Sequence, residues 1–352
     1  MPLSIGIVGL PNVGKSTLFN TLTKKQAPAE NYPFCTIEPN IGLVEVPDER
    51  LEKLAAISNP AKIVPTIIEF VDIAGLVKGA SEGEGLGNKF LSHIRECDAI
   101  CEVVRDFKDS NIIHVDNKVD PESDRSTINL ELILSDLATI SKRIDRVVRE
   151  AKTGDKKIII YKELLERIKK ELENEISARD INLTTEEKLA LKDLNLLTMK
   201  PIIYVLNIDE QDNDEIQESE NLIKINAKLE LDIATLPEEE QADYIKELGL
   251  KQTGLDKLIK ASYHLLGLVS FFTTGPIETK AWTVIKNTPA NIASGVIHTD
   301  FIKNFIRAEI INWQDFVQAG GEVKAKEKGL VRTEGKEYLI KDGDVCHFLI
   351  NK

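Results

Sequence analysis

The sequence predicts an α/β domain with a largely parallel sheet, a helical insertion within that domain, and a small α+β domain at the C-terminal end. Strand-like and helix-like segments alternate over residues 1–110, which is typical of a parallel sheet covered by helices. Between residues 126 and 196 apolar residues instead recur at spacings of three and four. The chain has 352 residues, 42% of them hydrophobic, and is long enough for two or three domains with real cores.

The first domain is expected to comprise residues 1–125 and 197–274. Runs of β-branched or apolar residues, bounded by glycine, proline or charge, predict its strands: Ser4–Val8, Ile41–Val46, Thr66–Val71, Ala99–Val104 and Pro201–Leu206. A helix is expected to begin at Lys15, between the first two strands. An amphipathic helix is predicted over Leu255–Leu268.

Residues 126–196 are predicted to form the helical insertion. The apolar residues of its first helix follow coiled-coil spacing: Leu130, Ile133, Leu137, Ile140, Ile144, Val147 and Ala151. A break at Thr153–Asp155 precedes a second apolar series beginning at Tyr161, so an antiparallel helical hairpin is expected. Thr184 and Glu187 have the spacing of a capping box and predict the start of a third helix.

Residues 275–352 are predicted to form the small α+β domain. Its strand-like runs are Ala281–Ile285, Tyr338–Ile340 and Val345–Ile350. The last two flank Lys341-Asp342-Gly343-Asp344, a sequence that favours a hairpin turn.

A phosphate-binding loop is predicted between the first strand and the first helix. Gly9-Leu-Pro-Asn-Val-Gly-Lys-Ser16 is a complete GxxxxGK[ST] motif, in which backbone N–H groups and a helix N-terminus face the phosphates. Lys15 supplies a mobile cation and Ser16 offers an oxygen to Mg²⁺. The residues expected to contact the nucleotide here are Asn12, Val13, Gly14, Lys15, Ser16 and Thr17. Asn12 is also a candidate ligand for K⁺.

Two further segments have the spacing of loops that respond to the γ-phosphate. Asp72-Ile-Ala-Gly75 ends the third strand as DxxG, where the aspartate can hold the magnesium shell and the Gly75 N–H can contact the γ-phosphate. The glycine-rich continuation Gly79–Gly87 is expected to be a mobile switch loop, and an ordinary surface loop is the alternative for it. Thr36, between the first helix and the second strand, is the natural second hydroxyl ligand of Mg²⁺.

The loop after the fifth strand favours ATP over GTP. GTPases read guanine there with NKxD, but this chain has Asn207-Ile208-Asp209-Glu210. Ile208 replaces the lysine that packs on the base, and Glu210 replaces the aspartate that pairs with guanine, while Asn207 can still bond adenine. Asn226-Ala227-Lys228 resembles the SAK-type loop whose backbone touches the base.

The residue that activates water is less evident. Leu76 occupies the position where many GTPases have a glutamine that orients the attacking water, and leucine cannot do so. His114, in the polar stretch 109–124, is a candidate for this role. On spacing alone, an exposed histidine without a role explains it equally well.

Composition limits the range of partners and locations. The formal net charge of −13 argues against a general nucleic-acid coat, but the charge is uneven. Residues 208–247 contain 14 acidic residues and 3 lysines, whereas residues 141–170 contain 11 basic and 5 acidic ones. The basic stretch is a candidate RNA contact, and a solvated helix face explains it equally well.

The sequence also predicts where the protein is located. No run approaches the ~18 apolar residues of a membrane span, and the four scattered cysteines suit a reducing compartment. We therefore expect a soluble cytoplasmic protein without membrane contact.

Together these motifs resemble the YchF family of Obg-like, ribosome-binding ATPases. The resemblance rests on GLPNVGKST, NYPFCTIEPN, DIAGLVKGASEGEGLGN and the N-x-x-E base loop. Four stretches extend it to the C-terminal end: Lys280–Thr283, His298–Phe301, Phe305–Ala308 and Lys341–Asp344. Asn226 departs from the pattern, because the usual loop has serine there.

The resemblance implies a P-loop GTPase-like domain, a coiled-coil insertion and a C-terminal TGS domain of β-grasp type. It also implies Mg²⁺-dependent ATP hydrolysis with weaker use of GTP, association with the ribosome, a role in translation or stress adaptation, and a hydrolysis-assisting role for His114. RNA contact through the helical arm 141–170 and the TGS domain is compatible with such a partner, and a monomer is expected. Two alternatives stay open: a conventional GTPase with a degenerate base loop, and a nucleotide-gated scaffold with little turnover.

Overall fold

The computed structural model describes residues 3–25, 27, 38, 40–73, 86–108, 118–209 and 218–351. The first of its two sheets has the strands β1 (Ser4–Val8), β2 (Ile41–Glu45), β4 (Ile67–Asp72), β5 (Ala99–Asp106), β6 (Ile202–Ile208) and β7 (Leu222–Ile225). Their order is β2-β4-β1-β5-β6-β7, and every pair is parallel except β2 with β4. This confirms the predicted α/β class and all five predicted strands, while β7 was not predicted.

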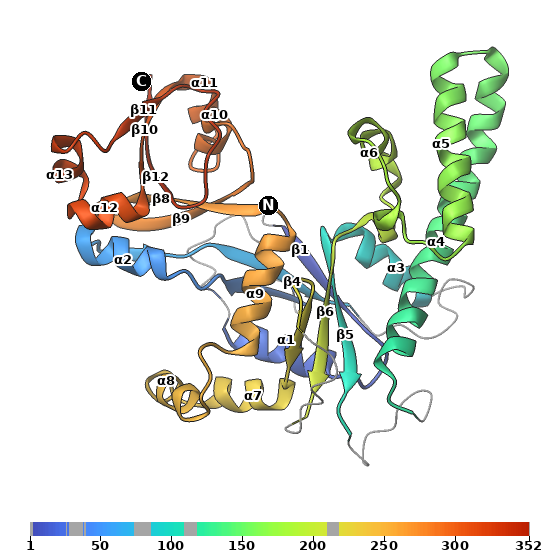
Figure 1. Cartoon of the computed structure of the whole chain (residues 1–352), viewed down its shortest axis with the longest axis horizontal. Helices are drawn as coiled ribbons and strands as arrows, with labels where there is room; N and C mark the ends of the chain where they lie inside the picture. Colours follow the sequence, from blue (N-terminus) through green and yellow to red (C-terminus); the bar gives the residue numbers. More distant parts are fainter. Residues whose placement is uncertain are drawn as a thin grey trace.

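Helices cover both faces of this sheet. Figure 1 shows α1 (Lys15–Lys24) and α9 (Gly254–Leu265) on one side, and α3 (Leu86–Glu96) and α4 (Pro121–Glu150) on the other. The helices belonging to this part of the chain are α1 (Lys15–Lys24), α3 (Leu86–Glu96), α7 (Ala227–Thr235), α8 (Glu238–Glu247) and α9 (Gly254–Leu265). The prediction that α9 continues to Leu268 was wrong, because Gly267 adopts φ 65°, a left-handed conformation that ends a helix. Within the described residues, none of the helices combines the length and apolarity needed to cross a membrane.

The insertion is a helical hairpin of α4 (Pro121–Glu150) and α5 (Lys156–Glu173). The first part of α4 packs on the first sheet through Ile128 and Leu132, and its second part projects with α5 away from both sheets (Figure 1). Ile133, Ile140 and Val147 of the predicted apolar series are buried in the core that α4 shares with α5. Leu130 is 41% exposed because it lies on the side of α4 opposite Ile128 and Leu132, which are buried in the core of the first sheet. Further along, α6 (Thr185–Leu191) begins with the predicted capping box of Thr184.

A buried carboxylate fixes the base of this arm. Asp136 of α4 is fully buried and accepts hydrogen bonds from the N–H groups of Leu197 and Thr198 (2.9 and 2.8 Å) and from the Thr198 hydroxyl (2.7 Å). These bonds satisfy the carboxylate and hold the chain where it returns from the arm to β6.

The second sheet contains β3 (Lys62–Val64), β8 (Leu268–Thr274), β9 (Glu278–Ile285), β10 (Phe305–Asn312), β11 (Arg332–Glu334) and β12 (Asp344–Ile350), in the order β11-β10-β12-β8-β9-β3. Short helices accompany it: α10 (Ala290–Ser294), α11 (Asp300–Asn304), α12 (Trp313–Ala319) and α13 (Glu322–Glu327). The predicted strands at 281–285 and 345–350 are present. β8, however, belongs to this sheet, although it lies before the domain boundary predicted at residue 275.

The predicted hairpin at the C-terminal end was wrong. Tyr338–Ile340 forms only an isolated bridge between Leu339 and Pro289, and β12 pairs with β10 and β8. The turn instead lies at the junction between the sheets, where the Asp342 carboxylate accepts hydrogen bonds from the Arg50 guanidinium (2.6 Å) and from the Ser270 N–H (2.9 Å).

The segment between β2 and β4 connects the two sheets. It carries α2 (Glu49–Ser58), which buries Leu51 and Leu54 against Phe272 of the second sheet, and β3, which pairs with β9. A strand from the first region thus completes the edge of the C-terminal sheet, so the two units share a core and a ladder of backbone hydrogen bonds.

Candidate functional site

The phosphate-binding loop lies between β1 and α1, as predicted. Asn12 and Gly14 have left-handed backbones, with φ of 64° and 98°. Any Cβ at Gly14 would collide with the side-chain amide of Asn207, so glycine is required there for two reasons. Val13 is buried beneath the loop, while Ser16 is exposed at the first turn of α1.

Lys15 is only 8% exposed, and its ammonium donates a 2.6 Å hydrogen bond to the carbonyl of Leu10. Burial lowers the pKa of Lys15 to about 8, and the nearby charge of Asp72 opposes that shift. The loop therefore holds a cation beneath the curve where phosphates bind in this motif.

Asp72 ends β4, opposite Ile7 of β1. Burial raises the pKa of its carboxyl, whereas Lys15 lowers it. A carboxylate here and the exposed Ser16 hydroxyl at the start of α1 are both hard oxygen donors, the ligand type that Mg²⁺ prefers. The residues present therefore fit this ion.

Asn207, at the end of β6, joins the phosphate loop to the base loop. Its side chain is 6% exposed, and its amide nitrogen donates to the Val13 carbonyl (2.9 Å). Its amide oxygen accepts from the N–H of Ala227 (3.1 Å). The described contacts of Asn207 are thus internal to the site, and its bond to adenine stays a prediction.

Asn226 caps α7, because its side-chain oxygen accepts from the N–H of Leu229 (3.0 Å). Asparagine and serine are both good N-caps, so the departure at this position preserves the local geometry. The backbone of Ala227 is consequently presented at the start of a helix, beside Asn207.

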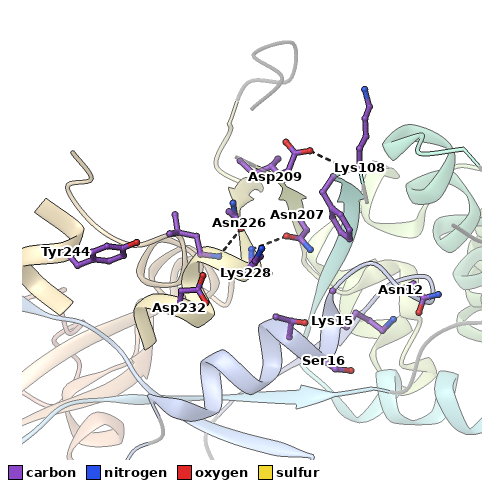
Figure 2. Close-up of a pocket in the computed structure, with 16 residues that line it drawn as sticks. Asn12, Lys15, Ser16, Lys108, Asn207, Asp209, Asn226, Lys228, Asp232 and Tyr244 are labelled. Carbon is purple, nitrogen blue, oxygen red and sulfur yellow. Dashed lines mark hydrogen bonds between the residues drawn. The ribbon is translucent and has the colours of Figure 1, made fainter. Parts of the chain in front are cut away.

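These loops enclose a pocket of about 730 Å³. Figure 2 shows Lys15 and Ser16 on one side of it, with Asn207, Asp209 and Asn226 arranged above them. The predicted site residues in its lining are Asn12, Gly14, Lys15, Ser16, Thr17, Asn207, Ile208, Asn226 and Ala227. Four of the predicted site residues, Thr36, Gly75, His114 and Glu210, lie outside the described residues.

Lys228 of the predicted Asn226-Ala227-Lys228 loop also lines the pocket. Several other lining residues were not predicted as site residues from the sequence: Phe107, Lys108, Asp209, Leu229, Asp232 and Tyr244. Phe107 and Lys108 directly follow β5, and ligands of open α/β sheets bind beyond the carboxyl ends of the strands. That rule was the signal that could have found them. Tyr244 belongs to α8, a helix that the sequence pattern did not predict.

Comparison with known proteins supports the resemblance. A family model described as "50S ribosome-binding GTPase" matches residues 4–229, and the YchF-GTPase C-terminal model, described as a protein of unknown function, matches residues 268–351. Proteins called "Ribosome-binding ATPase YchF" are similar over all of both chains, at 53% identity in Bacillus subtilis and 50% in Escherichia coli O157:H7.

A solved structure agrees with these relatives. The Schizosaccharomyces pombe YchF GTPase is 37% identical, with a TM-score of 0.87, over 99% of this chain and 97% of that one. Similarity along the whole chain, including the arm and the second sheet, shows that the chain belongs to the YchF family.

Proposed function

We propose that this protein is a Mg²⁺-dependent ATPase that uses GTP less well and acts as a nucleotide switch on the ribosome. The ATP preference rests on the sequence of the base loop, which Asn207 joins to the phosphate loop. Ile208 and Glu210 follow Asn207 in place of the residues that read guanine, and Ile208 lines the pocket. Relatives named ribosome-binding ATPases support the same activity.

Different residues of the site bind the phosphates, hold Mg²⁺ and orient water, as phosphoryl transfer requires. Lys15 and the backbone N–H groups around Gly14 hold the phosphates, and the N-terminus of α1 favours their negative charge. Bound Mg²⁺ would neutralise charge on the phosphate oxygens, and Ser16, Asp72 and Thr36 are the residues that would hold it. His114 orients the attacking water, the Gly75 N–H contacts the γ-phosphate, and Asn12 is the candidate K⁺ ligand.

Calorimetric titration with ATP and with GTP, each with Mg²⁺, tests the base preference. We expect tighter binding of ATP, because Glu210 in this frame cannot reproduce the paired carboxylate contact to guanine. The double variant Ile208→Lys, Glu210→Asp restores the guanine-reading pattern and is expected to shift the preference toward GTP by at least tenfold. Binding of GTP to the natural sequence more than tenfold tighter than ATP would favour a conventional GTPase.

The helical arm is the proposed ribosome contact, together with the second sheet. Lys152, Lys156 and Lys157 are exposed around the turn at the far end of the arm (Figure 1). Nearer its base, Arg167 is paired with Glu187 at 2.8 Å. RNA phosphates would meet the cations at the turn first. We also propose that the protein is a monomer and is located in the cytoplasm.

Turnover of ATP with and without ribosomes tests this partner and the scaffold alternative. We expect ribosomes to stimulate turnover, and Lys156→Ala, Lys157→Ala to reduce that stimulation severalfold while the basal rate stays unchanged. The control is Lys246→Ala, Lys251→Ala, which removes two exposed lysines outside the arm. Absence of turnover under both conditions would favour the scaffold.

A further inference from the structure

Arg105 is the largest of the fully buried side chains in the described part of the chain, at 2% exposed. It lies on β5 among apolar residues such as Val103 and Val104. Removing a guanidinium from water is costly unless its new surroundings compensate, and an aliphatic side chain would fill a strand interior more cheaply. The contacts of Arg105 therefore indicate why a charged group is present.

Two of these contacts are with one residue, Phe107. The Arg105 Nε–H donates to the carbonyl oxygen of Phe107 at 3.2 Å, and the guanidinium carbon lies 4.4 Å from the centroid of the Phe107 ring. Residues two apart along an extended chain project to the same side, so a single side chain can reach both groups. Arg105 thus fixes the backbone and the ring of Phe107 together.

Phe107 is part of the wall of the nucleotide pocket, together with Asn207 and Ile208. The next N–H along the chain, that of Lys108, donates to the carboxylate of Asp209 at 3.3 Å, which ties this segment to the base loop. Arg105 is also directly opposite Asn207 in the β5–β6 ladder. The ring therefore belongs to the nucleoside half of the pocket.

We propose that Arg105 is a positioning residue for the nucleoside half of the site, holding the Phe107 ring against the pocket wall so that its free face is ready to stack on the base. This inference rests on nucleotide binding in this pocket, as proposed above, but it does not depend on which purine is preferred. A ring held in place before binding loses no rotamer freedom when the base arrives, which gives tighter binding.

The test measures affinity for ATP and for inorganic triphosphate, each with Mg²⁺, by calorimetry. Arg105→Met keeps the length and apolar stem but removes the charge and the planar group. We expect it to weaken ATP binding about fivefold to tenfold and to leave triphosphate binding within twofold, because only ATP carries a base. Arg105→Lys keeps a donor and a charge without the planar stack, so it is expected to recover part of the loss.

Phe107→Ala supplies a second, independent measurement. If Arg105 acts through Phe107, the double variant Arg105→Met, Phe107→Ala binds ATP no more weakly than Phe107→Ala alone. The proposal would be overturned if the loss of ATP binding free energy in the double variant equalled the sum of the losses in the two single variants. It would also be overturned if Arg105→Met lost ATP and triphosphate affinity equally. If Arg105→Met does not fold, the loss of ATP affinity is compared with the loss of triphosphate affinity in Arg105→Lys instead.

Failure of the proposed function gives a different result. If the natural sequence prefers GTP, the ATP preference is wrong, and the same comparison of nucleotide with triphosphate is made with GTP. A selective loss of nucleotide affinity in Arg105→Met would then still support Arg105 as the positioning residue.

Discussion

Replacing Lys15 by alanine is expected to lower kcat/KM for ATP at least a hundredfold. The Lys15 ammonium is the buried cation of the phosphate loop, held by the Leu10 carbonyl and near Asp72. Because the Lys15 side chain is only 8% exposed, its interaction with the developing charge on the phosphates is stronger than it would be in solvent. Steady-state kinetics with ATP and Mg²⁺ measure the loss.

Lys24→Ala is the matched control for this variant. Lys24 is on the same helix but is exposed in its last turn, away from the pocket, so its removal is expected to leave kcat/KM within twofold. The free energy of unfolding of Lys15→Ala is expected to fall by less than about 1 kcal/mol, since losing a desolvated ammonium offsets the lost contacts. Wild-type kinetics in Lys15→Ala would remove this loop from the phosphate site.

Changing Asn207 to aspartate is expected to weaken binding of ATP and of inorganic triphosphate alike, by about thirtyfold to a hundredfold. The substitution keeps the shape of the side chain but replaces the donor to the Val13 carbonyl with a second acceptor. An unsatisfied buried acceptor costs about 1–3 kcal/mol, and burying a carboxylate there adds to that. Because Asn207 anchors the phosphate loop itself, the loss does not depend on the base.

The two ligands therefore separate the roles of neighbouring residues: Asn207 affects both of them, and Arg105 only the one that carries a base. Asn221→Asp makes the same chemical change at an exposed position next to β7 and is the control. Retention of triphosphate affinity in Asn207→Asp would mean that the bond between Asn207 and Val13 does not hold the phosphate loop in its binding shape.

Features that depend on neighbours along the chain were predictable from sequence. The phosphate loop follows from a strand, a glycine motif and a helix in succession, and the arm follows from apolar spacing with a break at Thr153–Asp155. The capping box of Thr184 and Glu187 was confirmed in the same way, because both of its hydrogen bonds join residues three positions apart.

Features that depend on pairing between distant segments were not predictable. β8 and β3 lie within the residues assigned to the first domain, and neither was predicted as a strand, yet both belong to the second sheet, where β3 pairs with residues more than 200 positions away. The turn at Lys341–Asp344 has hairpin residues, but the strands that β12 needs come from β10 and β8. Local propensity specifies a turn and leaves the partner of the strand to global packing.

In the candidate site, too, some features depend on neighbours along the chain and others on pairing between distant segments. By itself the sequence determined which residue types bind phosphate and Mg²⁺, since Lys15, Ser16 and Asp72 belong to short motifs with fixed spacing. Only the tertiary structure decided that Asn207 ties the phosphate loop to Ala227 and that Arg105 supports Phe107 in the pocket wall. Those contacts depend on strand register and on which side chains meet at the carboxyl edge of the sheet, and both are set only when the whole sheet has formed.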